Sequence, residues 1–262
     1  MGPLILSALV LLLFMSLLFL VALQRRDNSI VDIGYGPAFV LGVGATFLFA
    51  ANWHPRQWML LALIGTWGVR LGVHIFLRRQ GEDGEDFRYR RWRESWGRSF
   101  IWRSYLQIFL LQGAVVFLVS LPALLVMRAP GGPLGLCDLF GVLVWALGFC
   151  FEAVADWQLL RFKRDPRNRG RILQGGLWRY CRHPNYFGEA VLWWGIYLIA
   201  LGAGAGLAAL VSPLLIGFLL LRVSGVPMLE AKQGENPRFR DYQRRTHAFF
   251  PWFPKGTRDR EE

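Results

Sequence analysis

The feature that most constrains this 262-residue chain is a series of long apolar blocks. A helix needs about 20 apolar residues, at roughly 1.5 Å each, to cross the hydrocarbon core of a bilayer. Backbone groups in lipid must be hydrogen-bonded within the segment, so blocks of this length are expected to be helices. We count seven, at residues 3–23, 31–51, 57–77, 104–127, 138–160, 186–203 and 206–223. The sequence therefore predicts an all-α, polytopic membrane protein, a seven-transmembrane-helix bundle.

The charge distribution predicts the orientation of these helices. The chain has a formal net charge of +12. Its Arg-rich segments follow the first, third, fifth and seventh apolar blocks, so all of them fall on one side of the membrane. Basic loops remain in the cytoplasm. We therefore expect the N-terminus outside and the C-terminus inside, and topology explains the positive charge better than a nucleic-acid partner does.

The cysteines and the other ionisable residues give no sign of a metal site. Cys137, Cys150 and Cys181 are three in number and show no ligand spacing. We expect free thiols, no disulfide framework and no metal.

Two pairs of polar residues lie in or beside the apolar blocks. Asp32 and Tyr35 are three apart and share a helical face near the cytoplasmic end of the second block. Asp32 is either a helix cap or a functional group, and the sequence leaves both open. Glu152 and Asp156 lie one turn apart on the fifth block. Because an unpaired charge in a membrane is costly, these two acids favour a functional role over packing.

The segment after the fifth block, residues 161–182, is strongly basic and contains turn signals at Asp165-Pro166 and Gly175-Gly176. Clustered Arg side chains suit bidentate binding of phosphate oxygens. The same composition also follows from topology alone. A second loop, residues 81–100, mixes acids, Arg and aromatic residues, which predicts a helix at the membrane surface after a turn. Arg70 and His74, one turn apart in the third block, serve either a site or only the fold.

The run RILQGGLWRYCRHPNYFGE at residues 171–189 resembles the C-terminal signature of the steroid 5-alpha-reductase family of membrane reductases. The resemblance covers residues 105–254 and includes Leu111-Gln112-Gly113 and the Pro-aromatic ending. Looser forms of the motif occur in sterol reductases and in isoprenylcysteine carboxyl methyltransferases. The resemblance implies a single integral membrane domain, residues 1–262, with residues 1–103 on the substrate side and residues 104–262 on the cofactor side.

In the reductases this region holds NADPH, so the resemblance implies a set of cofactor-binding residues here. They are Glu152, Asp156, Lys163, Arg171, Tyr180, His183, Asn185, Glu189 and Arg222.

The substrate half departs from the family pattern. Its steroid-binding members have a Gln-Glu pair on the second helix and a Tyr on the third, which polarise the substrate's 3-keto group. Here the paired positions read Gly34-Tyr35, ahead of Pro37-Ala-Phe39, and the helix 3 position reads Ile75. We therefore expect Tyr35, with Asp32 behind it, to donate a hydrogen bond or proton to a substrate oxygen, and the natural substrate need not be a steroid.

The leading hypothesis is an NADPH-dependent oxidoreductase acting on CH-CH groups, like the 3-oxo-5-alpha-steroid 4-dehydrogenases. It would transfer hydride to a C=C conjugated with a carbonyl in a lipophilic substrate that enters from the bilayer. The expected location is a bacterial inner membrane, among lipids, with the cofactor site facing the cytoplasm.

The alternative is an S-adenosylmethionine-dependent membrane methyltransferase of the isoprenylcysteine type. That cofactor is a cationic sulfonium without phosphates, so it does not account for Lys163, Arg171, Arg182 and Arg222. A non-enzymatic lipid-binding scaffold or transporter is a third class, but the sequence lacks the matched broken helices typical of transporters.

Overall fold

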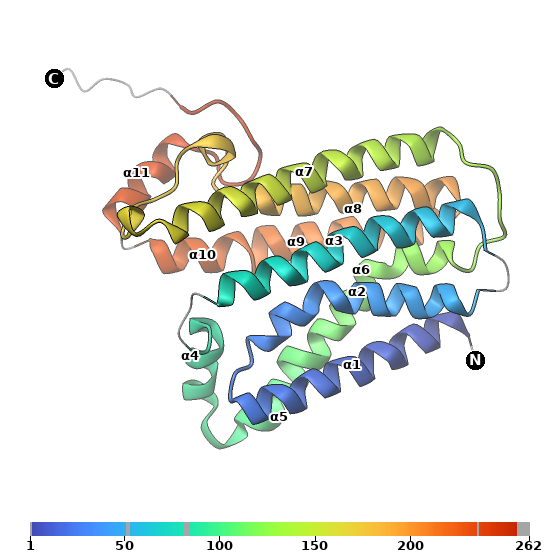
Figure 1. Ribbon diagram of the computed structural model, residues 1–262, viewed down its shortest axis with the longest axis horizontal. Coiled ribbons are helices and arrows are strands. Elements are labelled where there is room, and N and C mark those ends of the chain that lie inside the picture. The colour runs from blue at the N-terminus through green and yellow to red at the C-terminus, as the bar shows by residue number, and fades with distance from the viewer. Residues whose placement is uncertain (1, 51–52, 81–83, 235, 256–262) are drawn as a thin grey trace. The chain divides into compact units, whose positions relative to one another are not determined.

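A computed structural model describes residues 2–50, 53–80, 84–234 and 236–255 (Figure 1). Every regular element among these residues is a helix. The chain divides into two compact units. Unit 1 contains Met1–Asp138 and Ile199–Ser212, and unit 2 contains Leu139–Leu198 and Pro213–Glu262.

Unit 1 is built around three long helices and a segmented fourth. The elements are α1 (Pro3–Arg25), α2 (Ile30–Leu48), α3 (Pro55–Arg79), α4 (Phe87–Trp96), η1 (Gly97–Ser99), α5 (Phe100–Ser104), η2 (Tyr105–Leu110), α6 (Leu111–Val126) and η5 (Gly206–Leu210). The central helix, α2, packs against α1, α3 and α6. Its Gly36 meets Gly68 of α3 backbone to backbone, because a side chain at either position would overlap the other's carbonyl.

A buried ion pair stabilises the end of unit 1 where α3 begins. The guanidinium of Arg56 donates to both carboxylate oxygens of Asp138, from Nε at 2.6 Å and from Nη2 at 2.8 Å. Arg56 also donates to the carbonyl of Pro133, and Asp138 accepts from the backbone N–H of Gly135. Both charges are therefore surrounded by hydrogen-bonding partners, which is the condition under which a buried pair is tolerated.

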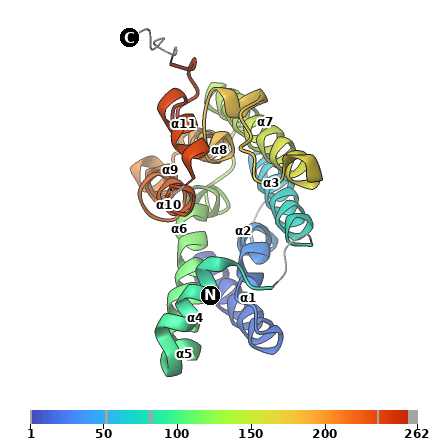
Figure 2. The same ribbon diagram turned by 90° about the vertical axis from the view of Figure 1, so that its left-hand side faces the viewer.

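Unit 2 consists of two long helices, a loop between them and a C-terminal layer. The elements are α7 (Leu136–Arg164), η3 (Pro166–Asn168), η4 (Gly176–Arg179), α8 (Pro184–Gly202), α9 (Val211–Phe218), η6 (Leu219–Val223), α10 (Val226–Gln233) and α11 (Pro237–Arg245). The first residues of α7 and α9 and the last of α8 belong to unit 1. η6 is a π-helix, a local widening that is frequent at functional sites. Figure 2 shows α11 close to α10, and Figure 1 places both at the same end of this unit.

Six stretches of the described residues are long and apolar enough to cross a membrane. They are Pro3–Arg25, Ile30–Leu48, Pro55–Arg79, Phe87–Val126, Leu136–Arg164 and Gly206–Gln233. These agree with six of the seven predicted spans, and the chain is an all-helical membrane protein as expected. The block predicted at 186–203 forms α8, which is not one of the six, so the seventh span and the orientation of the termini stay predictions. The helix expected within residues 81–100 is α4, and its place at the membrane surface stays a prediction. Of the turn expected before it, residues 81–83 lie outside the described residues.

Candidate functional site

The predicted acidic residues lie at a close contact between α7 and α8. A side chain at Gly188 of α8 would come within 2.5 Å of the backbone nitrogen of Glu152, and one at Gly148 of α7 within 2.6 Å of the Gly188 carbonyl. Two glycines therefore let the helix backbones meet. Glu152 is only 2% exposed at this contact.

One turn further along α7, Asp156 is paired with α8. The side-chain amide of Asn185 donates to Oδ1 of Asp156 at 3.2 Å. Glu189, one turn after Asn185 on α8, is also buried. Three of the predicted cofactor residues, Glu152, Asp156 and Asn185, thus come together at one helix interface, and a fourth, Glu189, is buried on the same helix as Asn185.

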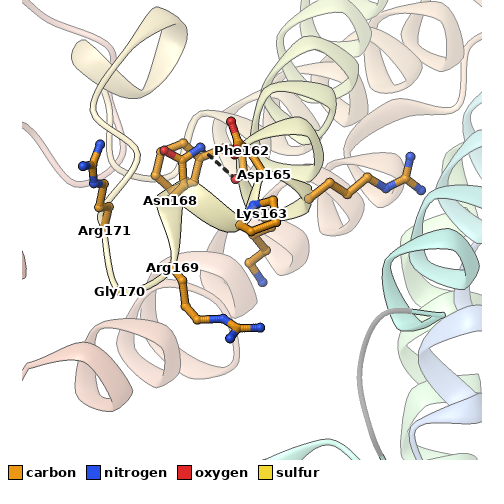
Figure 3. Close-up of a pocket in the computed structure, with 9 residues that line it drawn as sticks. Phe162, Lys163, Asp165, Asn168, Arg169, Gly170 and Arg171 are labelled. Atoms are coloured by element: carbon orange, nitrogen blue, oxygen red, sulfur yellow. Dashed lines mark hydrogen bonds between the residues drawn. The ribbon is translucent and has the colours of Figure 1, made fainter.

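A basic pocket of about 310 Å³ opens where α7 ends. It is lined by Phe162, Lys163, Arg164, Asp165, Pro166, Asn168, Arg169, Gly170 and Arg171. Figure 3 shows this loop with its cationic side chains around it. Two predicted cofactor residues, Lys163 and Arg171, both line the pocket. Lys163 follows Asp156 by two helical turns, so the pocket lies along the same side of α7 as the acids.

The pocket's one acid is already engaged. Asp165 accepts from the side chain and the backbone N–H of Arg167, and the side-chain hydrogen bond lowers the pKa of its carboxyl to about 2. Asn168 donates to the carbonyl of Phe162 and fixes the turn. Lys163, Arg164, Arg169 and Arg171 outnumber this single carboxylate, so the pocket is positively charged and suits an anionic ligand.

A second cluster, in which the predicted residue His183 meets an unpredicted partner, Glu230, joins the start of α8 to the C-terminal layer. Arg182 donates from Nε to Glu230 of α10 at 2.8 Å and through Nη1 to the carbonyls of Gln243 and Thr246. His183 Nε2 lies 3.1 Å from the same Glu230 oxygen, and the Gln243 amide donates to the other. The basic loop is therefore fastened to α10 and α11.

The neighbouring residues strengthen this attachment. The indole of Trp178 donates to the carbonyl of Ala155 on α7, and the hydroxyl of Tyr242 on α11 donates to the carbonyl of Trp178. Cys181 donates to the carbonyl of Phe249, and burial raises the pKa of its thiol to about 12.

The remaining predicted cofactor residues lie in three different settings. His183 stacks on Tyr186 and contacts Glu230. Tyr180 is partly exposed, and its ring packs on Phe253 of the tail. Arg222 lies in the π-helix η6 and is exposed.

The two predicted catalytic residues lie in unit 1 on α2. Asp32 accepts from Arg88 Nη2 and from the Tyr89 hydroxyl, both at 2.6 Å, so both of its oxygens hold the first turn of α4. Tyr35 is half-buried, and its ring packs edge to face on Phe39 with centroids 5.1 Å apart. Among the described residues no three His, Cys, Asp or Glu side chains gather as a metal site requires.

Comparisons with known proteins identify a family and several similar proteins. A family model described as a protein of unknown function (DUF1295) matches residues 18–246. An uncharacterized protein of Schizosaccharomyces pombe is 26% identical over 279 residues, covering 95% of this chain and 80% of the yeast protein. The 3-oxo-5-alpha-steroid 4-dehydrogenase 1 of Rattus norvegicus is 30% identical over 117 residues.

The matches to characterised proteins cover only part of each chain. The match to the rat enzyme covers 44% of this chain and 42% of the enzyme, less than half of either. A probable O-methyltransferase of Ustilaginoidea virens is 39% identical over 46 residues, only 18% of this chain and 16% of its own length. No solved structure matches this chain significantly.

Proposed function

We propose that this chain, which belongs to the DUF1295 family and is one of the steroid 5-alpha-reductase-like proteins, is a membrane reductase that uses NADPH. The similarity to the rat 3-oxo-5-alpha-steroid 4-dehydrogenase supports a reductase activity and its type, an oxidoreductase acting on CH-CH groups.

The observation that carries the cofactor proposal is the basic pocket at the end of α7. NADPH has a pyrophosphate and a 2′-phosphate, and Lys163, Arg169 and Arg171 present the charge that such groups need. A volume of about 310 Å³ is at the lower end of the roughly 300–1,000 Å³ range of ligand pockets. It therefore suits the phosphate-bearing part of a dinucleotide rather than all of it.

The interface of α7 with α8 would hold the rest of the cofactor. Asp156 and Asn185, already hydrogen-bonded to each other, offer carboxylate and amide groups that can bind ribose hydroxyls or a carboxamide. Glu152 and Glu189 offer further acceptors there. NADPH, when bound, would supply hydride to an electron-poor carbon, and these side chains would bind and orient it.

We propose an enone-type substrate, steroid- or lipid-like, that enters from the bilayer. Its reduction places developing negative charge on the carbonyl oxygen, which a hydrogen-bond donor stabilises. Tyr35 is the proposed donor, because its hydroxyl can both donate a hydrogen bond and deliver a proton. Asp32, whose carboxylate binds Arg88 and Tyr89, would act indirectly by holding α4 against α2. The proposed setting is a bacterial inner membrane with the basic pocket on the cytoplasmic side.

The methyltransferase alternative is not favoured. S-adenosylmethionine carries a positive sulfonium and no phosphate, so a pocket with several cations and one paired acid is unsuited to it. The methyltransferase-like relative also matches a far shorter part of this chain than the steroid dehydrogenase does.

Thermal unfolding of the purified protein in detergent tests the cofactor. NADPH, NADH and S-adenosylmethionine are compared, because a ligand that binds only the folded state raises the unfolding midpoint. We expect NADPH to raise it most and Arg171→Ala to abolish the rise. Arg244→Ala, which removes an exposed guanidinium of α11 outside the pocket, is the matched control and should retain it. Stabilisation by S-adenosylmethionine alone would refute the reductase.

Turnover tests the role of Tyr35 separately. NADPH oxidation is followed with enone lipids as substrates, for the wild type and Tyr35→Phe. Loss of a positioned proton donor typically costs about 10²–10⁴-fold in rate. The variant should lose turnover by a factor in this range while keeping the NADPH-induced thermal shift. Unchanged turnover would exclude Tyr35 as the donor and leave the cofactor proposal intact.

A further inference from the structure

The last ten described residues form an ordered strap rather than a free tail. The backbone N–H of Trp252 donates to the carbonyl of Tyr180, and that of Lys255 donates to the carbonyl of Arg245. The carbonyl of His247 accepts from the N–H of Arg182, and Phe249, within the same segment, is buried. The strap, residues 246–255, is thus fixed to the basic loop at Tyr180 and Arg182 and to the end of α11 at Arg245.

Three large aromatic side chains nevertheless project from this strap. Phe250, Trp252 and Phe253 are 68%, 66% and 71% exposed. Phe250 packs on Phe187 in the first turns of α8, and Phe253 packs on Tyr180, itself partly exposed. Trp252 also packs on Phe253, so the exposed rings form two aromatic groups on one short strap. Exposed large apolar side chains that gather in one place mark a surface that binds a partner or a membrane.

Positive charges border this aromatic surface. Lys255 and Arg245 are exposed and adjacent through their backbone hydrogen bond, and the Arg179 guanidinium lies 6.0 Å from the Tyr180 ring centroid. The strap itself contains no acidic residue. Asp241 of α11 is paired with Arg244 at 3.7 Å and so does not offset these three cations.

From this combination we infer that the strap surface, formed by Tyr180, Phe250, Trp252, Phe253, Arg179, Arg245 and Lys255, docks onto the anionic lipid head groups of the bilayer in which the protein resides. Aromatic rings with a polar edge favour the boundary between hydrocarbon and water, and neighbouring Lys and Arg bind anionic lipids. The strap lies against the first turns of α8 and the basic loop, and this loop directly follows the candidate span Leu136–Arg164, so a bilayer surface is close to it in the chain.

Docking of the strap on a bilayer would also restrict the motion of the basic loop. The strap holds Tyr180 and Arg182, and both belong to the segment that links the pocket to α8. A bilayer that fixes the strap would therefore restrain this loop. The lipid contact itself does not depend on the proposed reductase activity.

The docking is tested by measuring how far a fluorescent label, attached to one residue at a time, contacts lipid. Cys137 and Cys150, which are exposed, are replaced by Ala, whereas Cys181 can stay because its thiol is buried with a pKa raised to about 12. An environment-sensitive fluorophore is attached through Phe253→Cys, or through Arg167→Cys at a highly exposed position of the same unit. Both proteins are reconstituted into vesicles of phosphatidylcholine, with or without phosphatidylserine.

We expect the label at 253 to be quenched by brominated lipid and its emission to shift to shorter wavelength as phosphatidylserine increases. The label at 167 should respond less. In the background of Arg245→Gln and Lys255→Gln the dependence on phosphatidylserine should be lost. The matched control, Arg240→Gln with Arg167→Gln, removes the same number of exposed charges outside the strap. In this control the label at 253 should still respond to phosphatidylserine.

Two results would overturn the inference. One is a label at 253 that a water-soluble quencher reaches as readily as the label at 167. The other is an equal loss of phosphatidylserine dependence in the control pair, which would mean that net charge and not the strap determines the response.

Discussion

Glu230 joins three side chains that come from distant parts of the sequence. Arg182 and His183 precede it by 48 and 47 residues, and Gln243 follows it by 13. Removing the carboxylate in Glu230→Ala would leave the Arg182 guanidinium buried without its counter-charge. Loss of one partner of a charged hydrogen-bonded pair costs roughly 1–3 kcal/mol, or more where burial is complete. We expect a clear fall in the thermal midpoint, measured in detergent.

The control for Glu230→Ala is Asp241→Ala. Asp241 also pairs with an arginine, Arg244, but both side chains are exposed and the two atoms are 3.7 Å apart. Exposed pairs contribute about 0–1 kcal/mol, so the midpoint should scarcely change. Equal effects of the two substitutions would show that Glu230 is not a structural link between α8 and the C-terminal layer.

Single residues also show how far the sequence could predict the site. The spacing of Glu152 and Asp156 placed both acids on one face of a helix, and both are buried. Glu230 was missed because no local pattern reveals partners nearly 50 residues away. For Asp32 the alternatives stayed open because its partners, Arg88 and Tyr89, lie on a separate helix. Contacts between distant segments depend on packing that spacing alone does not encode.

At the scale of elements, the contact between α7 and α8 depends on glycine. In Gly188→Ala the new methyl group would lie 2.5 Å from the Glu152 nitrogen and from the Gly148 carbonyl oxygen. Both are backbone atoms, so the helices must separate, at a cost of roughly 1–3 kcal/mol. Because Asp156 and Asn185 meet across this contact, we expect a lower midpoint and a weaker thermal shift with NADPH. Gly217→Ala on α9, where the structure leaves open space, should lower neither.

Hydropathy predicted the helices of this chain well and their crossings poorly. Block length depends on the bilayer, so the predicted 206–223 span matches the extent of η5, α9 and η6. The close approach of α7 and α8 instead depends on which glycines face each other, and a glycine in an apolar block gives no sign of its partner. The π-helix at Leu219–Val223 was likewise invisible to a pattern of apolar residues.

For the whole molecule, the sides on which the two termini lie depend on whether α8 spans the membrane. Its 19 residues are enough for a crossing, and its early position next to the basic loop fits a start at the cytoplasmic face. Seven spans put the two termini on opposite sides, whereas six put them on the same side. Locating the two termini therefore shows whether the number of spans is odd or even, and with it whether α8 crosses the membrane.

Reporter fusions in a bacterial host measure this parity. Green fluorescent protein fluoresces only on the cytoplasmic side, and alkaline phosphatase is active only on the other. The Arg-rich loops predict a fluorescent C-terminal fusion and an inactive C-terminal phosphatase, since basic segments remain inside. With α8 as a span, an epitope tag at the N-terminus should be cleaved by external protease in spheroplasts. A protected N-terminal tag beside a fluorescent C-terminus would mean six spans, and α8 would then lie within or beside the membrane without crossing it.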